Sequence, residues 1–514
     1  MRSDQQQAIN RLAGTSATAF LCAVLCVYPL YIDKFSNLGV TKFTGCFTLF
    51  LLFLLWLVAC TAIGARAPRP RNANAGRDVT LWGVLAFAGT SLISTFTSLS
   101  PTASTWGLGG YYGGLMLVLF TAAGYWAVRS YLDLENLDFV FWVLGITTSI
   151  VAVLYVLNIF NIDLIGAYAD TAVVERAQFF STLGQKDFNG CFFSVALPIV
   201  FYQFLNAKDT RTAVWTGIPA AFGALALAVV DSEALALGIG AAVMVLVCHK
   251  NFTTRHLRRA ALISAAFFGW AAWMHYMRAS VYTQGGTALL AKLGAWQVAL
   301  PCMAASLLLW LVLFVLARKG IAAQAPLYLP GRVITIAVLA VGALAFVLAN
   351  AMPNLPLPES LHNLLVFNDD WGTYRGVAWR AAFGTWADGS LLRKIVGIGP
   401  GMMHTAVAAW AGDAMTARMA TFYAAHNEYL EQLLTTGILG LTAWLLLVAA
   451  HLQRGERNWN TPGVAPVMLA LCSYLAQAVV SIRVSMVFPL VMLLFGTLAA
   501  LTAPELPQPA APAP

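Results

Sequence analysis

Charged residues are scarce in this sequence. Only 10% of its 514 residues are Asp, Glu, Lys or Arg, whereas 60% are hydrophobic. Soluble domains need a much larger charged surface, so this composition excludes them and indicates a polytopic integral membrane protein. The formal net charge of +8 does not indicate nucleic-acid binding, because the basic residues recur in short groups between apolar runs and form no long cluster.

Sequence patterns of metal, disulfide and nucleotide sites are also missing. The eight cysteines lie inside apolar runs without CxxC spacing, which is typical of small buried hydrophobic residues. The seven histidines form no HxxxH or HExxH pattern, and a solvated surface explains the isolated pair Asp369 and Asp370 better than a metal site. The glycine-rich stretch at 107–114 lacks the strand and the Lys-Ser/Thr of a phosphate-binding loop. We therefore predict no metal and no cofactor.

Long apolar runs are abundant. Because a helix of about 20 residues crosses a ~30 Å hydrocarbon layer, we predict an all-α polytopic membrane protein with about 14 (12–14) transmembrane helices. Only Arg483 separates the last two runs. The predicted spans are 17–32, 43–64, 79–99, 111–128, 137–160, 188–205, 213–230, 234–248, 260–277, 296–317, 332–350, 429–450, 464–482 and 484–501.

The distribution of positive charge predicts the orientation. If the N-terminus is cytoplasmic, most of the 30 lysines and arginines fall on the cytoplasmic side, as the positive-inside rule requires. Both termini are then inside, in a multi-pass protein of the cytoplasmic membrane. The chain divides into an N-terminal transmembrane bundle of about 11 helices (1–350), an extracytoplasmic loop (351–427), C-terminal transmembrane helices (428–503) and a disordered Pro/Ala-rich tail (504–514).

The loop 351–427 is the one long polar interruption in the second half of the chain. Its segment RGVAWRAAFGTW places Arg375, Trp379, Phe383 and Trp386 on one face at 100° per residue, which predicts an amphipathic helix lying on the membrane. Arginine in that setting suits a diphosphate, because its planar fork donates two hydrogen bonds. A plain interfacial anchor is the alternative. GIGPG (397–401) predicts a rigid turn that permits close backbone approach.

A histidine precedes the next predicted span. Asn427 is a predicted N-cap, and Glu428 and Glu431 lie in the first helical turn. The helix N-terminus disfavours the imidazolium of His426, whereas the glutamates favour it. A neutral histidine here could act as a general base; the alternative is that His426 only supports the turn. If it does, the base must be sought among Glu428, Glu233 and Asp231.

The segment STLGQKDFNG (181–190) is a third polar piece, and it ends the loop before the predicted span 188–205. It is either a polar turn or part of a functional site. Taken in order, STLGQKDFNG, RGVAW, GIGPG and HNEYLEQLLTTGILG resemble the O-antigen ligase and O-antigen polymerase superfamily of Wzy_C-type membrane glycan transferases. The resemblance covers residues 180–447.

The resemblance implies a fold of many helices with one large extracytoplasmic loop. It also implies metal-independent transfer of a glycan from undecaprenyl diphosphate to an acceptor hydroxyl, in cell-surface polysaccharide assembly. Arg375 takes the place of the arginine that binds the donor diphosphate, and His426 that of the histidine proposed to activate the acceptor. The implied partners are a polyprenyl-diphosphate-linked glycan, a glycan or lipid acceptor and the lipid bilayer.

The sequence departs from the family pattern at residues 231–235. The family often has Ser-Arg there, with an arginine that contacts phosphate, whereas this chain reads DSEAL and places Glu233 after Ser232. The second phosphate cation is then Lys186, Arg380 or Arg278, or is absent. Asp231 and Glu233 either bind sugar hydroxyls or cap a hairpin. The full set of predicted substrate-binding residues is Arg380, Lys186, Asn189, Asn427, Trp379 and Glu233.

Other functions remain open from the sequence. A polysaccharide polymerase of the same superfamily would show the same motifs. A lipid-linked sugar flippase would have a similar number of spans but would place charges along a path inside them. A glycosyltransferase that uses a polyprenyl phosphate would depend on an outer carboxylate, for which Asp33 is the early candidate.

Overall fold

The computed structural model is built from helices. It describes residues 2–63, 78–108, 110–230, 232–280, 292–321, 323–352, 355–410 and 423–503. Within these ranges there is no strand, and the β-bridges Phe180–Gly184 and Thr253–Pro326 are isolated. The prediction of an all-α protein is confirmed. The predicted tail 504–514, the basic segment around residues 66–77 and Asp231 lie outside the described residues.

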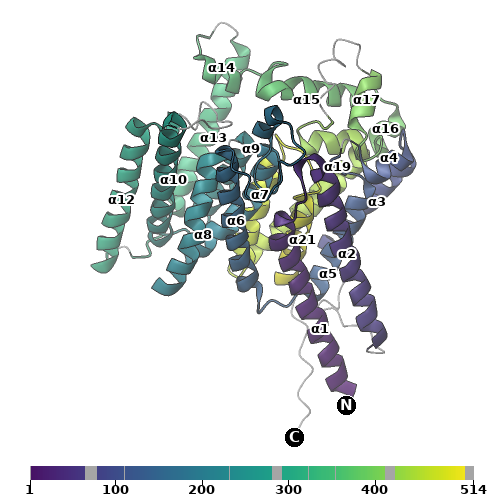
Figure 1. Ribbon diagram of the computed structural model, residues 1–514, viewed down its shortest axis with the longest axis horizontal. Helices are drawn as coiled ribbons and strands as arrows, with labels where there is room; N and C mark the ends of the chain where they lie inside the picture. Colours follow the sequence, from purple (N-terminus) through teal and green to yellow (C-terminus); the bar gives the residue numbers. More distant parts are fainter. Residues whose placement is uncertain are drawn as a thin grey trace.

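Each apolar run that predicted a span contains a helix (Figure 1). Among the described residues, nine helical segments are long and apolar enough to cross a membrane, as a polytopic membrane protein requires; a count of about 14 spans stays a prediction. The helices are α1 (Arg2–Cys22), α2 (Leu38–Ile63), α3 (Val79–Phe96), α4 (Pro101–Trp106), α5 (Leu115–Tyr131), α6 (Leu137–Ile159), α7 (Lys186–Asn206), α8 (Thr210–Val229), α9 (Glu233–Cys248), α10 (Thr254–Ser280), α12 (Trp296–Arg318), α13 (Tyr328–Ala351), α14 (Glu359–Leu365), α15 (Trp371–Ala387), α16 (Leu391–Val396), α17 (Met403–Trp410), α19 (Glu428–Arg457), α20 (Val464–Gln477) and α21 (Phe488–Leu501).

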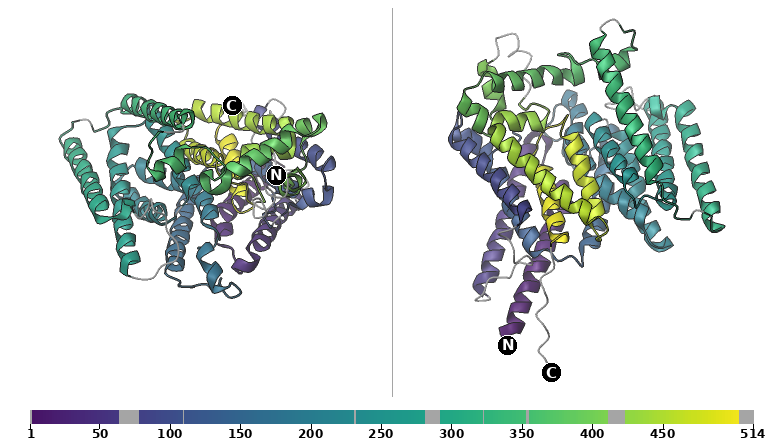
Figure 2. Two further views of the ribbon diagram at one scale, coloured as in Figure 1. Left: turned by 90° about the horizontal axis from the view of Figure 1, so that it is seen from above. Right: turned by 180° about the vertical axis from the view of Figure 1, so that it is seen from behind.

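The helices form a bundle with a cover at one end. α14 to α17 lie across the end of the bundle where α13 finishes and α19 begins (Figures 1 and 2). We call the described part of this segment, residues 355–410 and 423–427, the cap. The helices α10 and α12 pack on each other at one side of the bundle, and α7, α20 and α21 pack near its centre. The end of the bundle that lies away from the cap is called the basal face.

The first predicted span is a broken helix. α1 begins at Arg2, so the polar N-terminal segment is helical as well, and it leads into a π-helix (Ala23–Val27) and a 3₁₀-helix (Tyr28–Leu30). The break leaves backbone carbonyls without helical partners, which is costly inside a membrane protein. The fully buried Lys42 satisfies them: its ammonium group donates to the carbonyl oxygens of Tyr28 at 3.2 Å and Pro29 at 2.8 Å.

The last two predicted spans are shorter than the sequence suggested. α20 ends at Gln477 and α21 begins at Phe488, with Pro489 in the first turn, where proline is tolerated. Each has 14 residues and is about 21 Å long at 1.5 Å per residue, less than the ~30 Å hydrocarbon layer. The connection 478–487 is mostly buried, so the chain reverses inside the bundle.

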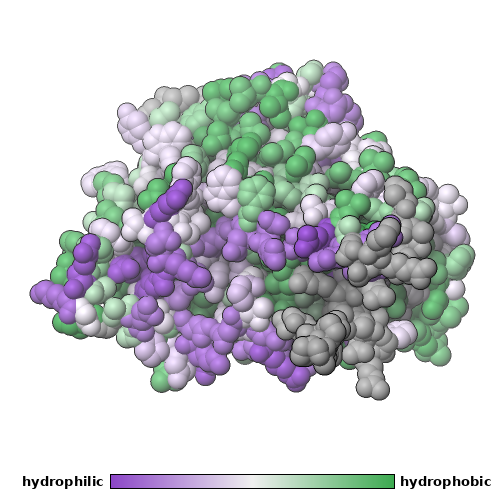
Figure 3. Space-filling model, turned by 90° about the horizontal axis from the view of Figure 1, so that it is seen from below, coloured by the Kyte–Doolittle hydropathy of each residue, from purple (hydrophilic) through white to green (hydrophobic). Residues whose placement is uncertain are grey.

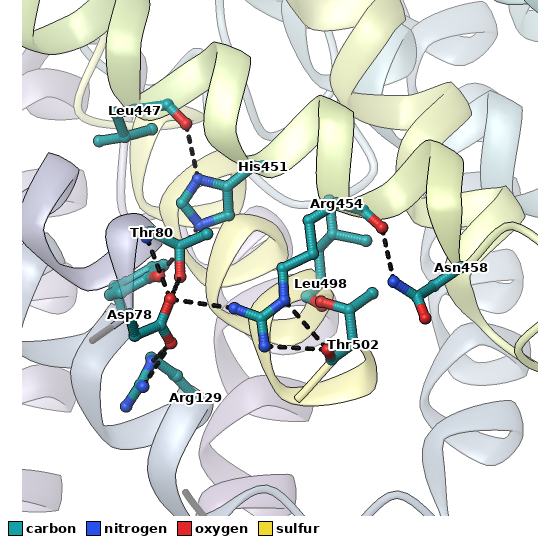
Figure 4. A network of polar contacts seen from close by, with 10 residues as sticks. Asp78, Thr80, Arg129, Leu447, His451, Arg454, Asn458, Leu498 and Thr502 are labelled. Atoms are coloured by element: carbon teal, nitrogen blue, oxygen red, sulfur yellow. Dashed lines mark hydrogen bonds and ion pairs between the residues drawn. The ribbon is translucent and has the colours of Figure 1, made fainter. Parts of the chain in front are cut away.

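A buried carboxylate ties helix ends together at the basal face (Figure 4). Asp78 caps α3 and accepts hydrogen bonds from Arg129 Nε at 3.0 Å and Arg454 Nη1 at 2.9 Å, and Arg454 also donates to the carbonyl oxygen of Thr502. Burial would raise the pKa of Asp78, but the hydrogen bond from Thr80 and the two guanidinium groups outweigh it and lower that pKa to about 2. The network connects α3, α5, α19 and the end of α21.

The predicted helix around Arg375 is confirmed, but its packing surface differs from the aromatic face. α15 packs into the cap through small side chains at positions 377, 378, 381 and 382, whereas Phe383 is 51% exposed. Small residues occupy the buried face because they let α15 approach its neighbours closely. Trp379 and Trp386 are half-buried, so Phe383 is the exposed aromatic side chain of the predicted face. Contact of this face with a membrane surface stays a prediction.

Two glycines allow the backbone of the cap to contact the backbone of α19. The N–H groups of Ile398 and Gly399 donate to the carbonyl oxygen of Thr435 at 3.1 Å and 2.9 Å. This contact requires Gly397 at φ 82° and a break in α19 at Gly437, where φ is 68°. A Cβ at Gly397 would collide with the backbone of Thr435, and one at Gly437 with the carbonyl oxygen of Ile395. The prediction that GIGPG permits close backbone approach is confirmed.

We expect Gly437→Ala to destabilise the protein by about 1–3 kcal/mol, because alanine meets both an unfavourable backbone region and a backbone clash. The measurement is the thermal unfolding midpoint of the purified protein in detergent. The matched control is Gly342→Ala in α13, where an added Cβ has nothing within 4 Å and alanine is the better helix former. Equal midpoints for the two variants would contradict this role of Gly437.

Candidate functional site

Residues from four distant segments meet beneath the cap. Asp187 lies in the first turn of α7, Glu233 starts α9, Arg375 and Trp379 belong to α15, and His426 lies just before α19. We call these five residues the cap site. All of them except Asp187 are candidate residues from the sequence, and Asp187 stands between two further candidates, Lys186 and Asn189.

Arg375 has a fixed direction. The three residues before it, 372–374, all have positive φ values of 60–69°, so the regular part of α15 begins at Arg375 itself. Its guanidinium group is 11% exposed and lies 3.0 Å from a carboxylate oxygen of Glu233, which is 72% exposed. Left-handed backbone at non-glycine residues costs energy and concentrates at functional sites. The arginine is therefore held in place by backbone geometry and by one exposed carboxylate.

His426 shares the environment of Arg375. It is half-buried with φ 51°, and its carbonyl oxygen accepts a 3.4 Å hydrogen bond from the indole of Trp379. Burial and then the charge of Arg375 lower the pKa of His426 to about 4, against a smaller opposite effect of Asp187. The imidazole is therefore neutral near pH 7 and can accept a proton.

The start of α19 confirms one prediction and corrects another. Asn427 is the N-cap: its side-chain oxygen accepts from the N–H groups of Tyr429 and Leu430, each at 3.0 Å. The glutamates predicted to act on His426 are directed elsewhere. Glu431 accepts from the N–H of Ala425, and Glu428 accepts from the Tyr474 hydroxyl. The anion that acts on His426 is Asp187, which no local pattern around the histidine reveals.

A buried ion pair supports the floor of the site. A carboxylate oxygen of Glu428 lies 3.6 Å from Arg483 Nε, and the Glu428 N–H donates to the carbonyl oxygen of Ala478. The guanidinium group of Arg483 lies over the rings of Phe488 at 4.6 Å and Phe87 at 5.4 Å. In the sequence Arg483 only separates two predicted spans. In the structure its half-buried side chain joins the connection 478–487 to the first turn of α19.

The other predicted binding residues are more dispersed. Arg380 pairs with Asp369 at the cap surface, and Lys186 is exposed at the start of α7 next to Asp187. Asn189 is fully buried and donates to the carbonyl oxygens of Gly184 and Gln185, so its amide holds the 181–190 turn. Arg278 lies in the last turn of α10. Of the proposed second cations, Lys186 and Arg380 are each next in sequence to a cap-site residue, Asp187 and Trp379 respectively, and Arg380 is paired with Asp369.

Charged side chains also lie inside the bundle. Lys42, Arg129 and Glu428 are all buried. Lys42 donates to backbone carbonyls, Arg129 pairs with Asp78, and Glu428 contacts Tyr474 and Arg483. They stabilise helix breaks and helix ends within the described residues. In the part of the chain that the structure describes, no three His, Cys, Asp or Glu residues form a group that could hold a metal ion.

Comparison with known proteins adds no identification. No family model matches the chain, and no curated protein matches it. The chemistry of the cap site therefore has to be argued from its own geometry: one buried guanidinium, one neutral imidazole and two carboxylates, all brought together from separate parts of the sequence.

We expect the effect of nearby charges on the pKa of His426 to be measurable from the pH dependence of its reaction with diethyl pyrocarbonate, which acylates only the neutral imidazole. Half-maximal labelling should occur near the pKa of about 4, below the ordinary histidine value of about 6.5. Arg375→Gln removes a repelling cation and should raise this midpoint, whereas Asp187→Asn removes an attracting anion and should lower it. Peptide mass spectrometry reads the label at His426.

The exposed His362 in α14 serves as the internal control, because its labelling should be unchanged in both variants. If the labelling midpoint of His426 changes in neither variant, the charges of Arg375 and Asp187 do not affect the pKa of this histidine.

Proposed function

We propose that this protein is an O-antigen ligase-like glycan transferase. It moves a saccharide from an undecaprenyl-diphosphate donor to an acceptor hydroxyl, without a metal ion, at the outer face of the cytoplasmic membrane. The observation that carries the proposal is the meeting of Arg375 and His426, from motifs about 50 residues apart, in one site where the charge of Arg375 contributes to the lowered pKa of His426. Polysaccharide polymerisation by the same chemistry is the nearest alternative.

Arg375 serves as the donor-binding group. Its buried guanidinium offers a planar fork for two phosphate oxygens, and charge-assisted hydrogen bonds of this kind are roughly twice as strong as neutral ones. Glu233 holds the guanidinium before substrate arrives, and a diphosphate carries more negative charge than this single carboxylate. Because Glu233 is 72% exposed, it can turn toward solvent when the diphosphate replaces it, or bind a sugar hydroxyl.

His426 serves as the general base. The acceptor hydroxyl oxygen attacks the anomeric carbon, its proton passes to the imidazole, and the bond from that carbon to the diphosphate oxygen breaks. The bonding electrons leave with undecaprenyl diphosphate, whose negative charge Arg375 stabilises. The proton on His426 then returns to solvent or to the departing diphosphate. A histidine that is neutral at pH 7 begins this sequence in the required state.

The proposed topology follows from the charge distribution of the sequence. The cap is the extracytoplasmic loop, both termini are cytoplasmic, and about 14 helices cross the membrane. Two features support this arrangement. The cap covers one end of the bundle, and the basic residues Arg255, Arg258 and Arg259 gather at the start of α10 on the basal face.

We expect Arg375→Lys to lower glycan transfer about tenfold or more, because the charge stays but the bidentate hydrogen bonding is lost.

His426→Ala should lower transfer by ~10²–10⁴-fold while donor binding persists, the usual scale for a lost general base. The assay uses purified protein in detergent with a polyprenyl-diphosphate glycan and an acceptor, with and without EDTA.

The matched controls are Arg393→Lys in α16 and His362→Ala in α14, both in the cap but outside the cap site, and both should retain transfer. Near-normal turnover of His426→Ala, with an unchanged pH profile, would assign the histidine a structural role. Movement of the donor across vesicles without a new glycosidic bond would favour a flippase.

We expect a cysteine at Asp388 to react with an impermeant maleimide in intact cells, and one at Lys319 to stay unlabelled until the cells are opened. Asp388 is exposed in the cap, and Lys319 is exposed just after α12 at the basal face. The parent protein gives the background from its native cysteines. Labelling of Lys319 alone in intact cells would reverse the orientation.

A further inference from the structure

A large pocket opens at the basal face, remote from the cap site. α7 begins at the cap site with Lys186 and ends at this pocket with Asn206, and α19 likewise runs from the cap site to the pocket wall. The cavity volume is about 880 Å³, within the usual range for small-molecule and cofactor sites. Its walls come from the starts of α6, α8 and α20, the end of α7, and the connections after α9 and α19.

One wall of the pocket carries exposed positive charge. Lys208 lies between α7 and α8, Arg211 lies in the first turn of α8, and both are exposed. The carboxylate between them in sequence, Asp209, uses its oxygens to cap α8: it accepts from the Thr212 N–H and hydroxyl, each at 2.8 Å. The Asp209 carboxylate also lies in the field of Arg211, but its hydrogen bonds go to Thr212, so the exposed ammonium and guanidinium groups of Lys208 and Arg211 remain suited to bind an anion.

Two further arginines fix this wall and add to its positive potential. Arg259 donates to the carbonyl oxygens of Phe204 at 3.0 Å and Leu205 at 3.1 Å, and Arg255 donates to that of Ala207. They thereby satisfy the carbonyl groups that end α7, which have no helical partners. Their N–H groups bond to the backbone at the end of α7, and their positive charges remain near this wall of the pocket.

The rest of the pocket is both aromatic and polar. Trp142, Trp215 and Trp459 line it, together with the amide side chains of Asn251 and Asn460, which bond to each other at 2.5 Å. Trp215 is 54% exposed at the side of α8. Viewed from below, the basal face carries a broad hydrophilic area bordered by hydrophobic surface (Figure 3). Tryptophan beside polar and basic groups at helix ends is typical of the membrane–water interface.

We propose that this basal pocket binds the phosphate headgroup of an anionic phospholipid. Lys208 and Arg211 would contact the phosphate, the tryptophans would lie against the glycerol and the upper acyl chains, and the paired asparagines would contact headgroup hydroxyls. A soluble phosphate compound shares the charge chemistry but does not use the apolar part of the lining. The inference is independent of the function proposed for the cap site.

The carboxylate of Asp138 provides a second test, in which the affinity for an anionic lipid should change in the opposite direction. Asp138 lies in the first turn of α6, is exposed, and lines the same pocket. Because it opposes a bound phosphate, its neutralisation should strengthen binding of an anionic lipid, whereas neutralisation of Lys208 and Arg211 should weaken it. A stability defect alone would not produce opposite changes at two walls of one pocket.

The experiment is a native mass spectrometry titration of the full-length protein in detergent, with phosphatidylglycerol and phosphatidylcholine. The parent should prefer phosphatidylglycerol, and Lys208→Gln with Arg211→Gln should lower its affinity about tenfold or more, the scale expected for two lost charge-assisted contacts. Asp138→Asn should raise that affinity severalfold. Arg318→Gln with Lys319→Gln, at the end of α12 outside the pocket lining, should change neither value.

Two results would overturn the proposal. One is an unchanged phosphatidylglycerol preference when Lys208 and Arg211 are both neutralised. The other comes from competition: inorganic phosphate or glycerol 3-phosphate should displace the lipid only at far higher concentration. Displacement by either compound at concentrations comparable to the lipid would assign the pocket to a soluble phosphate ligand.

Discussion

The carbonyl oxygen of Thr435 is the contact on which the cap depends. The break in α19 at Gly437 leaves this oxygen outside the regular helical pattern, and it accepts hydrogen bonds from Ile398, Gly399 and the hydroxyl of Ser94. One acceptor therefore joins the cap, α19 and α3. Together with the hydrogen bond from Trp379 to His426 and the ion pair between Arg375 and Glu233, it holds the cap in a defined position on the bundle.

The cap site balances charge with few groups. A buried guanidinium beside an imidazole is unfavourable once the imidazole is protonated, so the same proximity that helps bind an anion also keeps His426 neutral. Glu233 pairs with Arg375 and reduces the cost of its burial, and Asp187 acts on His426 in the opposite direction without cancelling the effect of Arg375. Such a balance is difficult to achieve with residues from one segment, because neighbours in sequence point to different sides of a helix.

Local signals in the sequence predicted much of the fold. Long apolar runs located the helices, Asn427 marked the start of α19, and the glycines of GIGPG indicated a close backbone contact. These features depend on the chemistry of a few adjacent residues. The same holds for the helix that carries Arg375, although its buried face was set by the packing of small residues, which periodicity alone does not decide.

Features that depend on distant contacts could not be predicted. Asp187 acts on a histidine more than 200 residues later, and Arg483 pairs with a glutamate in another helix. The early end of α20 and late start of α21 depend on a reversal inside the bundle, and nothing in the apolar run itself marks it. A single sequence contains the residues at both ends of such contacts but does not show which of them pair. The rest of the cap-site geometry also depends on contacts between distant residues.

The connection between α20 and α21 has a consequence for biosynthesis. Glu428 is buried at the start of α19, yet Tyr474 and Arg483, the side chains that bind its carboxylate, follow about 50 residues later. Until that part of the chain has been inserted, the carboxylate has no partner in the bundle, and an uncompensated buried charge costs several kcal/mol. The floor of the cap site is therefore assembled last, after the cap above it has been translated. A chain that ends before α20 contains most of the helices but lacks both Tyr474 and Arg483, so the Glu428 carboxylate is left without these two contacts.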